Sequence, residues 1–254
     1  MTLDADLTSC ARLVERGDPL RFRTAMMAPL EARKKLFALY AFNVEVSRAP
    51  WVTKEPMIAE MRLQWWRDVL EEIAQGGDVR RHEVATPLSG VITAAQARRL
   101  DELIVARRWD IYTDAFEDAD DFARYIDSTA GHLMLTATEL LGDADEEVVR
   151  NAGYAAGVAA WLQALPALEE AGRVPLLDGT PSGIAALARA GTKALQDARG
   201  SRAAVSRRCN PALLPATAAE PVLRHATAHP LDVADGRLPV PGVNFSLRAL
   251  TGRW

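Results

Sequence analysis

Arginine and aromatic side chains are concentrated between residues 33 and 70, which makes this segment a candidate ligand-binding region. The arginines are Arg33, Arg48, Arg62 and Arg67, and the aromatic residues include Tyr40, Phe42 and Trp65. Arginine makes forked contacts with phosphate oxygens, and aromatic rings form apolar walls. A pocket of this kind would hold an amphiphile with a phosphate head and a hydrocarbon tail. The alternative is that the rings belong to the core and the arginines to a solvated helix face.

Acidic residues are clustered at two places, around Asp118–Asp121 and from Asp143 to Glu147. Each cluster precedes an apolar helical pattern, where carboxylates cap backbone amides and oppose the helix dipole. We therefore predict helix caps there and not a metal site. The four histidines are scattered, and the two cysteines form no Cys-x-x-Cys pair, so no zinc site is expected.

The elements that must position these residues are predicted to be helices almost throughout. Apolar residues recur at three- and four-residue steps, with caps or breakers between the runs. The expected helices span about 3–17, 31–49, 56–75, 94–112, 148–170, 182–199 and 215–227. Thr93 should cap the fourth of these, and Glu31 should pair with Lys35 one turn on.

Length and composition indicate one domain of ordinary size. The chain has 254 residues, of which 49% are hydrophobic. We expect a single all-helical domain over residues 1–229 and an extended tail over 230–254, where Pro and Gly recur. A net charge of −4 argues against a general nucleic-acid binder.

The cellular location is predicted from what the sequence carries. The N-terminus is acidic, without the pattern of a secretory or transit signal, and no apolar stretch approaches the roughly 20 residues of a membrane span. We expect a cytoplasmic protein with two reduced cysteines. Peripheral contact at the inner face of a membrane stays open.

Several segments resemble the squalene/phytoene synthase family in order and spacing. They are Arg33 with Leu36 to Phe42, Arg62 to Asp68, Tyr125 with Gly131 and Leu140 to Gly142, Ala156-Gly157, and Gly172 to Leu176. The resemblance covers roughly residues 18–178. It implies an all-α isoprenoid-synthase-type bundle of helices around a central cavity.

The resemblance also implies a metal site that this sequence does not preserve. Active members of the family join two prenyl diphosphates head to head, using Mg²⁺ held by two aspartate motifs that face each other across the cavity. The first should fall near Ser47–Trp51, which reads Ser-Arg-Ala-Pro-Trp. The second should lie between Gly157 and Arg173, where only Glu169 and Glu170 could stand in. Adjacent helical residues point about 100° apart and make no clamp.

Two functions follow from this departure. In the first, the chain is a non-catalytic family member, similar to the aspartate-lacking branch that includes a mitochondrial complex I assembly factor. It would bind a prenyl or lipid ligand, or assist assembly of a respiratory complex, without a cofactor. In the second it is a working prenyltransferase of isoprenoid biosynthesis, in which the arginines help to neutralise diphosphate and Mg²⁺ is the only cofactor to consider.

Overall fold

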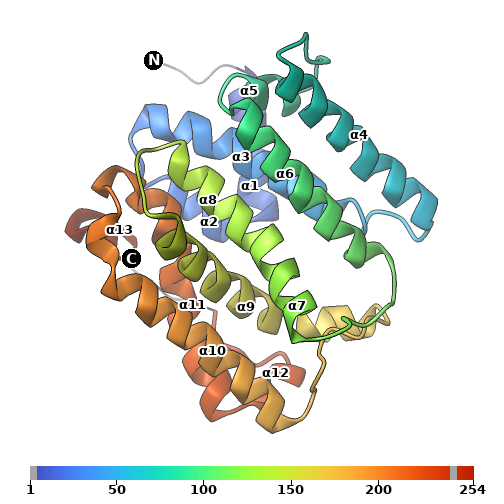
Figure 1. Ribbon diagram of the computed structural model, residues 1–254, viewed down its shortest axis with the longest axis vertical. Helices are drawn as coiled ribbons and strands as arrows, with labels where there is room; N and C mark the ends of the chain where they lie inside the picture. Colours follow the sequence, from blue (N-terminus) through green and yellow to red (C-terminus); the bar gives the residue numbers. More distant parts are fainter. Residues whose placement is uncertain (1–4, 241–244) are drawn as a thin grey trace.

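Helices account for nearly all regular structure in the computed structural model, which describes residues 5–240 and 245–254 except the side chain of Leu250 (Figure 1). The α-helices are α1 (Ala5–Gly17), α2 (Pro19–Ala25), α3 (Leu30–Arg48), α4 (Pro56–Gln75), α5 (Ala85–Ser89), α6 (Ala94–Arg107), α7 (Ala119–Ile126), α8 (His132–Glu139), α9 (Glu146–Glu170), α10 (Pro181–Gly200), α11 (Asn210–Ala228), α12 (Leu231–Ala234) and α13 (Phe245–Thr251). Shorter turns are η1 (Arg108–Ile111), η3 (Arg202–Ala204), η4 (Arg207–Cys209) and the π-helical η2 (Asp127–Gly131). Over the described ranges no strand forms, and the all-α prediction is confirmed.

Capping side chains start the helices where the sequence predicted them. The Thr93 hydroxyl accepts the backbone N–H of Gln96 at 3.3 Å, and the Gln96 side chain accepts the Thr93 N–H at 2.9 Å. Asp118 accepts the N–H of Asp121 at 2.8 Å, and Asp145 caps α9 at 3.1 Å. Both acidic clusters therefore include a residue that satisfies an otherwise unpaired backbone donor, as predicted.

Two local predictions are wrong. Glu31 pairs with Lys34 at 2.8 Å, whereas the Lys35 ammonium donates to the carbonyl of Leu140 at 2.9 Å. That carbonyl belongs to the residue that follows α8, where a helix leaves carbonyls unpaired. Helix α11 also starts earlier than predicted and keeps two prolines, Pro215 and Pro221, inside it. Its residues 210–219 are all buried, so packing offsets the lost backbone hydrogen bonds.

The C-terminal segment is not an extended tail throughout. It includes α12 and α13, and residues 241–244 lie outside the described part. Val233, Phe245 and Trp254 are at most 4% exposed and join the core formed around α9 to α11. Apolar burial therefore overrides the loop-forming composition of this segment. The domain limit at residue 229 remains a prediction.

The helices pack around two hydrophobic cores. One is built mainly from α1, α3, α4 and α6, and the other from α7 and α9 to α11. Helix α9 runs between α8, α10 and α11, while α4 packs on α6 at one edge of the molecule (Figure 1).

A close approach of two backbones fixes α9 against the π turn η2. A Cβ atom on Gly153 would lie only 2.9 Å from the Cα of Gly131 and 3.3 Å from the carbonyl oxygen of Ala130. Any side chain at Gly153 would therefore push the two segments apart. The turn η2 sits beside the central cavity described below, and π turns of this kind are frequent at functional sites.

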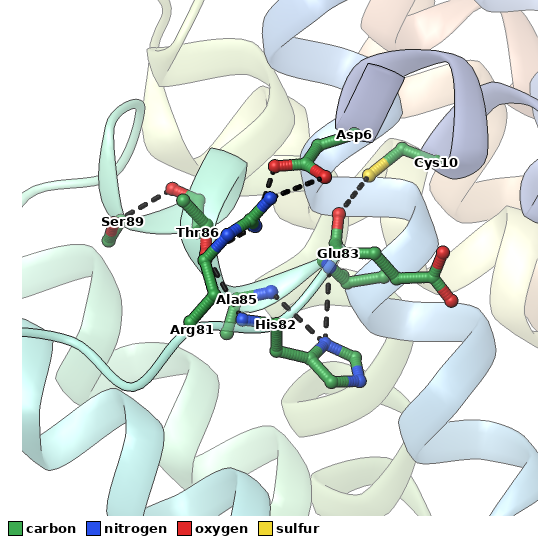
Figure 2. Close-up of polar contacts among 9 residues, drawn as sticks. Asp6, Cys10, Arg81, His82, Glu83, Ala85, Thr86 and Ser89 are labelled. Atoms are coloured by element: carbon green, nitrogen blue, oxygen red, sulfur yellow. Dashed lines mark hydrogen bonds and ion pairs between the residues drawn. The ribbon is translucent and has the colours of Figure 1, made fainter.

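Helix α1 is attached to the segment before α5 by polar contacts (Figure 2). Arg81 pairs with Asp6 at 2.6 Å, and the Cys10 thiol donates to the carbonyl of Glu83 at 3.4 Å. His82 Nδ1 accepts the backbone N–H of Val84 at 3.1 Å, which orders the start of α5. Cys10 and Cys209 are both buried thiols and form no disulfide, as predicted. No described helix combines the length and apolar character needed to span a bilayer.

Candidate functional site

A central cavity of about 380 Å³ lies between the two cores. Its walls come from α2, α3, the end of α6, the α7–η2–α8 segment and α9. On α3 the lining residues are Asn43 and Ser47, followed by Trp51 just beyond the helix. The predicted central cavity is therefore present, and the segment expected to carry the first aspartate motif does face it.

The wall contributed by α9 is apolar and built from small residues. Ala156, Gly157, Ala160 and Ala164 line the cavity at three- and four-residue steps, so they share one face of the helix. Trp161 completes this wall, with its indole N–H donating to the carbonyl of Pro175 at 3.0 Å. Small side chains leave open volume, and the surface that they present suits a hydrocarbon chain.

The opposite end of the cavity is polar and centred on a buried carboxylate. Asp110, whose side chain is 3% exposed, accepts a hydrogen bond from the Tyr125 hydroxyl at 2.7 Å. Arg107 pairs with the other Asp110 oxygen at 3.1 Å and donates to the Tyr125 oxygen at 2.9 Å. Arg173 donates to the backbone carbonyl of Asp110 at 2.8 Å. The carboxylate is therefore already held on both oxygens.

A second arginine on the lining, Arg21, approaches from α2. It pairs with Asp18 at 2.6 Å and lies 5.8 Å from the centre of the Tyr40 ring. Burial would lower the pKa of Arg21, but Asp18 and Tyr40 outweigh it and the pKa lies above its ordinary value. For Arg107, burial is outweighed in the same way by Tyr125 and Asp110. Both guanidinium groups are permanently charged.

Positive charge exceeds negative charge at this end of the cavity. Arg21 and Arg107, which line the cavity, are paired with the carboxylates Asp18 and Asp110, and Arg173, which lies behind the lining, adds a third positive charge next to Asp110. The Nε atoms of Arg107 and Arg173 are buried with no hydrogen-bond partner among the described residues. A buried unpaired donor is costly, and an anion is the group that would satisfy it.

The donor set of the cavity does not fit Mg²⁺. Ser47 donates its hydroxyl proton to the carbonyl of Val44 at 3.1 Å, and Trp51 offers no oxygen ligand. Among the lining residues Asp110 is the single carboxylate, and its two oxygens already accept hydrogen bonds from Arg107 and Tyr125. Within residues 5–240 and 245–254 no group of three His, Cys, Asp or Glu side chains is placed to hold a metal ion. Magnesium prefers several free hard oxygen ligands in octahedral geometry.

The four arginines singled out from the sequence lie outside the lining of this cavity. Arg33 donates to the carbonyl of Ala28 at 2.6 Å, and Arg48 and Arg62 are exposed on α3 and α4. Arg67 forms a forked pair with Asp101 at 2.7 and 3.0 Å that joins α4 to α6. Their role in phosphate binding stays a prediction.

Tyr40, Phe42 and Trp65, the aromatic residues predicted to line a cavity, are not among the lining residues of this one. Phe42 packs edge-on against Trp66 with 5.3 Å between the ring centres, and Trp65 contacts Trp66 and His82. Tyr40 is buried one turn before Asn43 and reaches the site through Arg21. The helical period explains this, because residues 43 and 47 share a face and residue 42 points about 100° away from it.

Sequence reasoning did not identify as site residues the polar side chains that line the cavity, chiefly Arg21, Arg107, Asp110 and Tyr125. Tyr125 was named only within a segment that resembles the family. They come from α2, α6, η1 and α7, which are separated by up to about a hundred residues in the chain. The one local signal is the Arg107/Asp110 pair at i and i+3, which also fits an ordinary surface pair.

Comparison with known proteins identifies the family to which the chain is similar. The model of the squalene/phytoene synthase family matches residues 14–176, close to the limits of the resemblance seen in the sequence. A Drosophila melanogaster protein named NADH dehydrogenase (ubiquinone) complex I, assembly factor 6 homolog is 31% identical over 166 residues, covering 62% of this chain and 50% of that protein. The Homo sapiens assembly factor 6 is 27% identical over 163 residues, with 62% and 48% covered. The chain thus spans about half the length of these relatives.

Solved structures show the same fold. A dehydrosqualene synthase in complex with ligand superposes with a TM-score of 0.74 at 14% identity, covering 97% of this chain and 93% of that one. The squalene synthase HpnC from Alicyclobacillus acidocaldarius gives 0.74 at 18% identity, covering 92% and 95%. The all-α bundle is therefore of the isoprenoid-synthase type, and the chain belongs to the squalene/phytoene synthase family.

Proposed function

We propose that this chain is a non-catalytic family member that binds a prenyl or other phosphate-headed lipid and acts as an assembly factor for a respiratory complex. The observation that carries the proposal is the lining of the cavity. Its apolar wall and surplus arginines suit an amphiphile, while Ser47 and Trp51 stand where the family would place metal-binding carboxylates. Without those ligands, ionisation of an allylic diphosphate loses its main source of charge neutralisation.

The assembly role is supported by the relatives. Four of them carry the name complex I, assembly factor 6, and a fifth is its homolog. We propose that this chain has a partner of the same kind, a respiratory complex during its assembly. A cytoplasmic location with contact at the inner face of the membrane is part of this proposal.

Exposed apolar side chains beside the cavity support membrane contact. They belong to the α3–α4 connection and the start of α4 and are Trp51, Val52, Met57, Ile58 and Met61. Met57 and Met61 are 76% and 66% exposed, one turn apart on α4. Trp51 also lines the cavity, so this patch borders the place where a lipid would enter.

The alternative is a prenyltransferase that neutralises diphosphate with arginine. Arg21 and Arg107 support this interpretation, because both line the cavity. Arginine holds a diphosphate but does not bridge its oxygens as a metal does. Mg²⁺ would enter only in this alternative.

Incubation with farnesyl or geranylgeranyl diphosphate and Mg²⁺ distinguishes the non-catalytic function from the prenyltransferase alternative. We expect no squalene- or phytoene-type product and no release of pyrophosphate above the protein-free rate, since the single carboxylate among the described lining residues, Asp110, is already paired. An active squalene synthase in the same buffer serves as the control. Product formed by the purified chain would establish the prenyltransferase alternative.

Deletion of the gene tests the assembly role. We expect less assembled complex I on native gels and lower NADH:ubiquinone activity, with unchanged squalene and carotenoid content. The wild-type gene should restore both measurements, but Met57→Glu/Met61→Glu should not, because charges would replace the apolar patch. Leu231→Glu, an exposed leucine on α12, is the matched control and should restore them. Normal complex I with depleted isoprenoids would contradict the proposal.

A further inference from the structure

The central cavity is closed where α9 meets the π turn η2. A Cβ atom on Gly157 would lie 2.7 Å from the Ala130 Cβ and 2.7 Å from the Cγ2 of Ile126. All three residues line the cavity, so its two walls touch at this point. One turn earlier on α9, Gly153 is in similarly close contact with the backbone of Gly131. A longer cavity would require α9 and η2 to separate, which their close packing opposes.

The polar end of the cavity lies beside the other end of the α9 wall. The backbone N–H of Arg173 donates to the carbonyl of Leu168 at 3.0 Å, and its side chain donates to the carbonyl of Asp110 at 2.8 Å. Leu168 and Asp110 both line the cavity. A ligand with its head at the polar end would therefore lay its tail along α9 toward Gly157.

The length of the α9 wall limits the tail that it can cover. The lining residues of α9 extend from Ala156 to Leu168, and at 1.5 Å of rise per residue this wall is about 18 Å long. With C–C bonds of about 1.5 Å, an extended five-carbon prenyl unit advances roughly 5 Å. Three units therefore measure about 15 Å and leave room for a head, whereas four units measure about 20 Å and exceed the wall.

Volume and charge both favour one ligand molecule in the cavity. The volume of about 380 Å³ is near the lower end of the range of about 300–1,000 Å³ found for small-molecule sites. Among the residues described at the polar end, Arg21 and Arg107 are each paired with a carboxylate, so Arg173 supplies the surplus positive charge. A second anionic head would repel the first, and one surplus charge does not offset that repulsion.

We propose that the central cavity holds a single prenyl chain of about fifteen carbons, and that Ala156 limits the length of this chain. The inference rests on the proposed function, because it specifies the ligand of the same cavity. Active family members join two such chains, and a cavity that holds one chain cannot bring two together, whatever metal is supplied. Ala156 is the first lining residue of α9 and is half-buried, so the space in front of it would receive the end of the tail.

Calorimetric titration of the full chain with geranyl, farnesyl and geranylgeranyl diphosphate, without Mg²⁺, measures the number and the length of the bound tails. We expect one ligand per protein molecule. Farnesyl diphosphate should bind at least about tenfold more tightly than geranyl diphosphate, because a further five-carbon unit is buried. Geranylgeranyl diphosphate should gain less than about threefold over farnesyl diphosphate, because its last unit stays outside the cavity.

The outcomes of this titration separate the inference from the function on which it rests. Two farnesyl ligands per protein molecule, or a larger gain for the geranylgeranyl chain, would overturn the single fifteen-carbon chain and leave lipid binding in place. No binding of any of the three diphosphates would overturn the prenyl ligand itself, and the inference with it.

Replacing Ala156 with Phe tests the length limit. The ring would fill the closed end, so the affinity for farnesyl diphosphate should fall to about that for geranyl diphosphate, which should change less than about twofold. Ala190→Phe, at an exposed alanine on α10, is the matched control and should keep the wild-type preference. Thermal unfolding checks that each variant is folded, and the milder Ala156→Val should shift the preference in the same direction. Wild-type preference in both folded Ala156 variants would overturn the role of Ala156.

Discussion

Replacing Arg21 with Gln should weaken the binding of a prenyl diphosphate to the central cavity by about ten- to a hundredfold. Arg21 lines the cavity, its side chain is 20% exposed, and its charge is fixed by Asp18 and Tyr40. A hydrogen bond from a charged donor contributes roughly 1.5–3 kcal/mol where water is largely excluded. Gln is polar and of roughly similar size, but it lacks the positive charge and the paired N–H donors of the guanidinium group.

The measurement is a fluorescence or calorimetric titration with farnesyl diphosphate in the absence of Mg²⁺. Arg21→Lys keeps the charge without the planar fork and should lie between wild type and Arg21→Gln. Thermal unfolding of each variant shows whether Asp18, left without its partner, has disturbed α2.

The same titration decides between the two sets of arginines. Arg33 and Arg62 were candidates from their positions beside aromatic residues, yet one bonds a backbone carbonyl and the other is exposed on α4. We expect Arg33→Gln and Arg62→Gln to change the affinity less than about twofold. If either weakens binding more than Arg21→Gln does, the ligand binds outside the central cavity.

Much of the fold could be predicted because its determinants are local. The Thr93 cap, the proline that opens α4 at Pro56 and the carboxylate caps of α7 and α9 each act within four residues of where they occur. The resemblance located the cavity-facing residues Ser47, on α3, and Trp51, just beyond that helix, because the order of segments is retained even where the ligands have changed.

The polar end of the site could not be predicted, because it is formed by residues that are distant in the sequence and meet only in the tertiary structure. Tyr125 and Asp110 meet Arg107 only after α6, η1 and α7 have folded back on one another. An arginine next to aromatic residues in sequence is a weak indicator, since Phe42 and Ser47 share a helix yet only Ser47 lines the cavity. Likewise, Lys35 does not pair with Glu31 but donates to the carbonyl of Leu140, which is 105 residues away in the sequence.

Replacing Arg107 with Met should lower the free energy of unfolding by about 3–5 kcal/mol, and the melting temperature by roughly 6–20 °C. Met fills similar volume but leaves the Asp110 carboxylate, 3% exposed, without its positive partner. Tyr125 would still donate to it, but a neutral hydroxyl does not neutralise a buried charge. Urea and thermal unfolding measure the loss.

A second substitution separates loss of the charge pair from loss of packing. Asn at position 110 keeps an acceptor for Tyr125 while removing the negative charge, so Arg107→Met/Asp110→Asn should recover most of the stability lost by Arg107→Met alone. The neighbouring Arg108→Met is the matched control, because Arg108 is 49% exposed and its pair with Glu60 lies at the surface. We expect that control to cost at most about 1 kcal/mol. Equal losses for Arg107→Met and Arg108→Met would mean that water reaches Asp110, and the cavity would then lack the low-dielectric polar end on which ligand binding depends.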